Sequence, residues 1–147
     1  MNVLRVLIIV GVLWGGLQYW NRHEAAVALA AATDDNGFVD VPPVEGQNSD
    51  TIYVVAALNC PHEDAQRADR LAEQLRDKGI SVIRTDSVNY HWSDADSSGA
   101  VIDRVNTVMN GPLPLVFVRG RVRPAATLDQ VMAELAAPAK AAPASSP

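Results

Sequence analysis

The chain has 147 residues, enough for one modest domain with additional segments at its ends. Its formal net charge is −5 and no run of lysine or arginine occurs, so it lacks the basic surface that nucleic-acid binding requires. A single cysteine excludes an intramolecular disulfide and a cysteine-rich metal site, but it permits a mixed disulfide with another molecule. The 3 histidines lack the spacing of metal ligands, and we predict no metal site.

The N-terminal segment carries the strongest hydrophobic signal in the chain. Residues 3–20 are apolar apart from Arg5 and Gln18, and they end in a Tyr-Trp pair that suits a membrane–water boundary. We predict a transmembrane anchor, or uncleaved signal, over residues 1–22. Arg5 and the terminal amine favour a cytoplasmic N-terminus, whereas Arg22 on the other side of the segment opposes it; the first orientation places the following domain on the extracytoplasmic side. Cleavage of the segment as a signal would instead give a secreted or periplasmic protein, and a buried soluble helix is the third alternative.

Two segments flank the predicted domain without signs of a core of their own. Residues 23–49 begin with alanines and continue with Pro42, Pro43 and Gly46, a composition typical of a linker. Residues 138–147 consist of Ala, Pro and Ser with one Lys, and we expect a disordered tail there. The folded domain is therefore predicted over residues 50–137.

The first half of this domain has the pattern of a strand, a helix and a second strand. Residues 51–58 form a nearly continuous apolar, β-branched run, as in a strand covered on both faces. A helix is expected next, with Asn59 as its N-cap and Pro61 in its first turn, ending at Gly79. The second strand follows over residues 80–84, and such a unit makes the two strands parallel.

The second half contains a helix, a hairpin and a last helix. A polar loop over residues 85–98 precedes a helix over 99–110. The runs 115–118 and 121–123 are separated by Arg-Gly, which is typical of a hairpin. A capping-box pattern at Thr127 opens the last helix. The order β-α-β-α-β-β-α predicts an α/β fold with a mixed four-stranded sheet and helices on both faces.

Two residues of this pattern stand where a known family keeps its site. The only cysteine, Cys60, follows the first strand directly and is succeeded by Pro61, while Pro114 precedes the third strand. At these positions the sequence resembles the thioredoxin superfamily, and the glutaredoxins in particular, over residues 50–137. The resemblance implies a thioredoxin-like fold with Cys60 as nucleophile and a cis-proline at Pro114. It also implies that His62 stabilises the thiolate, and that Pro61, Leu113 and Pro114 contact the substrate.

The chain departs from the family at one position that decides the chemistry. Glu63 stands where the second cysteine belongs, which makes a single-cysteine Cys-Pro-His-Glu variant. The leading expectation is a membrane-anchored, glutaredoxin-like protein that performs monothiol thiol–disulfide exchange through Cys60. Its partner would be a protein or glutathione mixed disulfide, with glutathione as co-substrate and no resident cofactor. The alternative is a redox-inactive thioredoxin-fold binding module that docks a partner in an envelope complex, so the sequence leaves open whether the protein is an enzyme.

Overall fold

The computed structural model describes residues 33–138. Within this range no helix is long and apolar enough to cross a membrane. The predicted anchor over residues 1–22 lies outside the described residues, as does nearly all of the predicted tail over 138–147.

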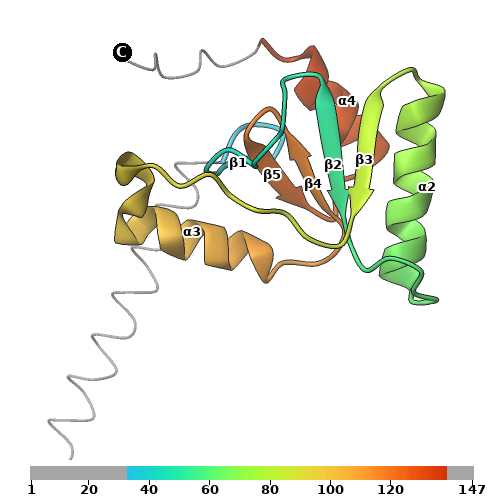
Figure 1. The fold of residues 1–147 in the computed structure, drawn as a ribbon. Coiled ribbons are helices and arrows are strands. Elements are labelled where there is room, and N and C mark those ends of the chain that lie inside the picture. Colours follow the sequence, from blue (N-terminus) through green and yellow to red (C-terminus); the bar gives the residue numbers. More distant parts are fainter. Residues whose placement is uncertain (1–32, 139–147) are drawn as a thin grey trace, which may run out of the picture.

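The described chain forms an α/β unit with five strands and three α-helices (Figure 1). In chain order these are β1 (Val39–Asp40), β2 (Thr51–Val55), α2 (Glu63–Asp77), β3 (Ser81–Thr85), a short 3-10 helix η1 (Asp94–Ser97), α3 (Gly99–Met109), β4 (Leu115–Val118), β5 (Arg121–Pro124) and α4 (Leu128–Ala136).

All five strands belong to one mixed sheet in the order β1-β5-β4-β2-β3. Strands β2 and β3 pair in parallel, as predicted for a strand–helix–strand unit, and the other neighbours pair antiparallel. The predicted hairpin is also confirmed, since Val118 pairs with Arg121 across Arg119-Gly120. The sheet has five strands rather than the predicted four, because β1 adds an edge beside β5.

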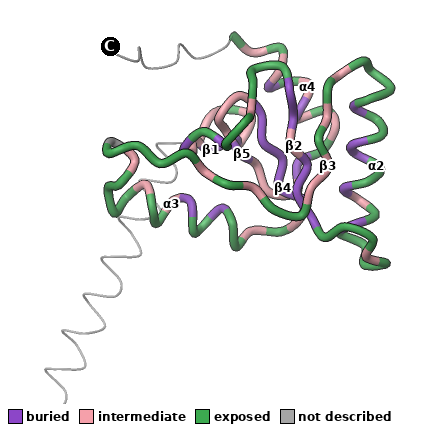
Figure 2. The backbone as a smooth tube through the Cα atoms, viewed as in Figure 1, coloured by how far each residue is buried: buried purple, intermediate pink, exposed green. Residues whose placement is uncertain are grey.

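The sheet has a separate apolar core on each face. On one face α2 and α4 pack on strand residues such as Ile52 and Val54, and Leu75 and Val131 are fully buried there. On the other face α3 contributes Val108 to a cluster around Phe117 and Val122. Alternate residues of a strand point to opposite faces, so a strand buried on both sides is apolar throughout. Figure 2 shows this as buried central strands between helices whose outer surfaces are exposed.

The structure differs from the prediction of a linker over residues 23–49, because the chain joins the fold from residue 33 onward. Phe38 is fully buried in the first core, and Val44 lies in the second. Val39 pairs with Val122, which makes this segment an edge strand. Of the residues that indicated a linker, Pro42 is itself buried and Gly46 lies in a turn that follows Val44.

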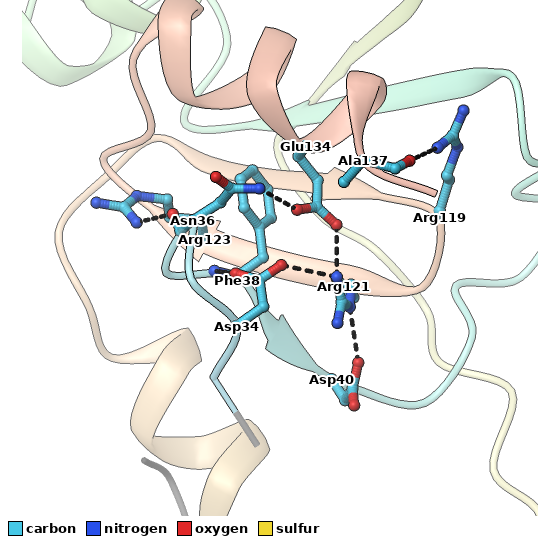
Figure 3. A network of polar contacts seen from close by, with 9 residues as sticks. All are labelled: Asp34, Asn36, Phe38, Asp40, Arg119, Arg121, Arg123, Glu134 and Ala137. Carbon is cyan, nitrogen blue, oxygen red and sulfur yellow. Dashed lines mark hydrogen bonds and ion pairs between the residues drawn. The ribbon is translucent and has the colours of Figure 1, made fainter. Parts of the chain in front are cut away.

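A partly buried ion-pair network holds this segment in place (Figure 3). The Arg121 guanidinium lies 2.7 Å from carboxylate oxygens of both Asp34 and Glu134, and 2.9 Å from one of Asp40. Asn36 donates a hydrogen bond to the other Glu134 oxygen at 3.1 Å. Burial alone would raise the pKa of the Asp34 carboxyl, but hydrogen bonding with Glu134, the Phe38 amide and the Arg121 charge lower that pKa below its ordinary value.

Helix starts agree with the sequence in one case and differ in another. At α4, Thr127 and Gln130 form the expected capping box. Helix α2 begins at Glu63 with His62 as its N-cap residue, so the predicted N-cap at Asn59 is wrong. Asn59 has a φ of 52°, a left-handed conformation that asparagine tolerates, and the chain turns there before it enters the helix.

Candidate functional site

Cys60 lies in the loop between the end of β2 and the start of α2. It is a free thiol of intermediate exposure. The left-handed turn at Asn59 precedes it, and Pro61 and His62 follow it in exposed positions. The side chain of His62 makes no capping hydrogen bond to the helix. The thiol therefore sits just before the helix rather than within its first turn.

The peptide bond between Leu113 and Pro114 is cis, at the position where the resemblance implies a cis-proline. Pro114 is fully buried, and Leu113 packs against both apolar cores. Strands β2 and β4 pair antiparallel with Val55 opposite Leu115. The chain leaving β2 and the chain entering β4 therefore lie at the same end of the sheet.

Arg67 connects helix α2, which follows the Cys60 loop, to the segment before β4. Its guanidinium donates a hydrogen bond to the Leu113 carbonyl at 3.2 Å, across from α2 to the loop before β4. The same side chain lies 3.6 Å from a Glu63 oxygen and 3.5 Å from an Asp64 oxygen. These carboxylates of the first turn thus share one cation, and all three side chains are at least two-fifths exposed, so the ion pairs themselves add little stability.

Two further contacts fix the loop at its ends. Gln66 donates from its side-chain amide to the Pro61 carbonyl at 2.9 Å. At the other end, Arg84 of β3 donates to the carbonyls of Ala56 and Ala57. The sequence reasoning missed the roles of Arg67 and Arg84, because both act on residues far away in the chain. The only local signal was a charged residue at the end of a predicted strand.

The aromatic residues of the loop after β3 lie against the opposite core. Tyr90 packs on Phe117 with ring centroids 6.1 Å apart, and its hydroxyl donates to the Met109 sulfur at 3.2 Å. Burial raises the pKa of Tyr90 to about 12. Trp92 touches Tyr90 edge-on and, at 45% exposure, borders a shallow hollow of about 330 Å³. The hollow is lined by Trp92, Ser97, Ile102, Val105 and Asn106.

Over residues 33–138 no group of three or more His, Cys, Asp or Glu side chains is arranged to hold a metal ion. The sequence-based expectation that no metal or resident cofactor is involved stays a prediction. The residues that follow Cys60 in sequence include the exposed His62, Glu63 and Asp64. The guanidinium groups of Arg67 and Arg84 bind backbone carbonyls of Leu113 and Ala57 in the neighbouring segments.

Fold and site together define an α/β protein with one partly exposed thiol at the carboxyl end of a central strand. The chain matches no family model, no curated protein and no solved structure. Its function must therefore be argued from the site.

Proposed function

We propose that residues 50–137 are a thioredoxin-like domain related to glutaredoxins, and that Cys60 performs monothiol thiol–disulfide exchange. Residues 1–22 would hold the domain at a membrane, on its extracytoplasmic side. The observation that carries the proposal is that the Cys60 loop and the cis Leu113–Pro114 bond lie at the same end of the sheet, where Arg67 of the helix after Cys60 donates to the Leu113 carbonyl. The order of strands and helices, with a parallel β2–β3 pair and a β4–β5 hairpin, is also the one that the resemblance implies.

The chemistry needs one protein thiol and an external partner. The Cys60 thiolate attacks one sulfur of glutathione disulfide, a new S–S bond forms, and the old S–S bond breaks. The departing glutathione thiolate takes a proton from solvent, so Cys60 is oxidised and one glutathione is reduced. Glu63 occupies the second cysteine position, so a second external thiol must resolve the mixed disulfide. Protonated His62 would favour the attacking thiolate by its charge.

Mass spectrometry of the intact protein tests this proposal directly. The full chain in detergent is incubated with glutathione disulfide, and one glutathionyl adduct is expected at Cys60. The adduct should disappear with added reduced glutathione. Cys60→Ser is the control and should gain no mass. A wild-type chain that stays unmodified while denatured chain reacts would refute thiol exchange at this site.

A second candidate function is a redox-inactive binding module that docks a partner in an envelope complex. The observation that favours it is the hollow beside Trp92 and Ile102, two large apolar side chains that are 45% and 43% exposed. Exposed apolar surface of this kind is typical of contact sites. Under this function, Cys60→Ser keeps full activity in cells, whereas replacing Trp92 by serine abolishes it. Loss of activity in Cys60→Ser cells would exclude the binding module.

A further inference from the structure

Arg84 is the most extensively bonded cation near the candidate site. It lies on the edge strand β3, yet its side chain is only 9% exposed. One terminal nitrogen, Nη1, donates to the carbonyls of Ala56 and of Thr85, the latter at 2.8 Å. The other, Nη2, donates to the Ala57 carbonyl at 2.8 Å, and Nε lies 2.9 Å from an Asp69 carboxylate oxygen. All three guanidinium nitrogens are thus engaged.

The carbonyls of Ala56 and Ala57 belong to the first residues beyond the end of β2. Strand β2 ends at Val55, and Ala56, which is 2% exposed, still donates its N–H to the Thr85 carbonyl. A buried carbonyl without a donor is costly, and Arg84 supplies the donor for Ala56 and also bonds the carbonyl of its exposed neighbour Ala57. Arg84 therefore holds the backbone of the two residues that follow β2 on the way to Cys60.

Asp69 makes the contact a link between three elements. It lies on α2, so the Arg84 guanidinium joins β3, the end of β2 and the helix that follows Cys60. The Cys60 loop is consequently held at both ends, by Arg84 at Ala57 and by Gln66 at Pro61. Only residues 58–60 lie between the two held carbonyls.

We propose that Arg84 is a positioning residue for the Cys60 thiol: its planar guanidinium fixes the backbone from which the thiol projects. The inference rests on the proposed thiol exchange for its role in a reaction. Lysine could keep the charge, but a single ammonium cannot reproduce the rigid fork that serves two successive carbonyls and a carboxylate. Arg84→Lys should therefore behave like Arg84→Met rather than like wild type.

The test compares two reactions of the same thiol in the full chain. Cys60 is the only cysteine, so iodoacetamide alkylation and adduct formation with glutathione disulfide both report on it alone. A small alkylating reagent needs access, whereas disulfide exchange also needs the sulfur aligned with the attacked bond. We expect Arg84→Met and Arg84→Lys to lower the exchange rate about tenfold relative to the alkylation rate. Hydrogen exchange of the amides of residues 56–60, above all the Ala56 amide that donates to the Thr85 carbonyl, should become faster in both variants.

Arg76→Met is the matched control. Arg76 also donates to a carbonyl of β3, that of Val82 at 3.4 Å, but it is exposed and far along α2 from the loop. It should leave the ratio of the two rates and the loop exchange at wild-type values. The inference is overturned if Arg84→Met folds and keeps both the wild-type ratio of disulfide exchange to alkylation and the wild-type amide exchange of the loop. It is also overturned if the disulfide-exchange rate and the alkylation rate of a variant change by the same factor.

Two complications have a defined outcome. If Arg84→Met fails to fold, the same two rates are compared in Arg84→Lys and Asp69→Asn. Asp69→Asn leaves Arg84 in place but removes the negative charge that orients its guanidinium. Should wild-type chain form no glutathione adduct, the proposed function fails separately, and amide exchange alone decides. Faster exchange in residues 56–60 then supports the hold of Arg84 on the loop, and unchanged exchange overturns it.

Discussion

Replacing Phe38 by alanine tests whether the segment before β2 is part of the folded unit. Phe38 is fully buried against the core formed by α2, α4 and the sheet. Deleting a buried phenyl ring removes its transfer free energy and leaves a cavity, which together cost about 3–5 kcal/mol. A domain of this size has a free energy of unfolding of about 5–15 kcal/mol, so Phe38→Ala should lose a large part of it.

Urea denaturation followed by far-ultraviolet circular dichroism measures this loss. With a slope of about 2 kcal/mol per molar urea, a loss of about 4 kcal/mol lowers the unfolding midpoint by about 2 M. The control is Glu45→Ala, an exposed residue of the same segment, which should change stability by less than about 0.5 kcal/mol.

The alternative gives a different result. If residues 23–49 were a linker, Phe38→Ala and Glu45→Ala would have the same midpoint as wild type. Equal midpoints in the two variants would refute the packing described here for Phe38, and with it the assignment of β1 to the sheet.

Four further predictions concern other contacts. Arg121→Met removes the guanidinium that lies between the carboxylates of Asp34, Asp40 and Glu134, and should cost about 3–5 kcal/mol in the same urea assay. Because folding lowers the pKa of Asp34, this carboxylate contributes to the free energy of unfolding above its unfolded pKa, and that contribution is lost as the pH falls through the folded pKa. Asp34→Asn should lack this acid-dependent loss of stability in a series of urea midpoints measured at different pH values. Burial raises the pKa of Tyr90 to about 12, so folding favours the protonated phenol, and the free energy of unfolding should fall as the pH rises from the ordinary tyrosine pKa through the folded value. Tyr90→Phe should abolish that fall, and it should also remove the tyrosine that ionises at the highest pH in a titration followed by tyrosinate absorbance. Gly111→Ala places a Cβ 2.8 Å from Pro124 and 2.9 Å from the Val108 carbonyl and should cost about 1–3 kcal/mol by thermal or urea unfolding, whereas Gly99→Ala, with nothing within 4 Å, should be neutral.

Much of the fold could be predicted from local sequence patterns. Strand β2, the parallel β2–β3 unit, the β4–β5 hairpin and the capped start of α4 each have a signal within a few neighbouring residues, such as the Thr127 capping box. The edge strand β1 could not be predicted in this way. It has two residues, too few to show an alternating pattern, and Phe38 and Val44 are buried by contacts with residues far along the chain.

The site shows the same division. Cys60 and Pro114 could be found because each stands directly beside a predicted strand. The helix start was misplaced by three residues because the turn at Asn59, and not the proline, decides where the helix begins. Arg67 and Arg84 could not be found, since Arg67 binds a carbonyl 46 residues away and Arg84 binds carbonyls 28 and 27 residues away.

The packing of residues 33–44 limits how far the domain can stand from a bilayer. If the proposed anchor ends at residue 22, only residues 23–32 connect it to the folded unit, and not the longer stretch up to residue 49. Ten residues, 23 through 32, span at most about 35 Å when extended and about 15 Å as a helix. A domain tethered by so few residues stays within that distance of the membrane surface. Its protein partners would have to come to the membrane surface, as membrane proteins or by diffusing to it, whereas a small molecule such as glutathione disulfide reaches it by diffusion.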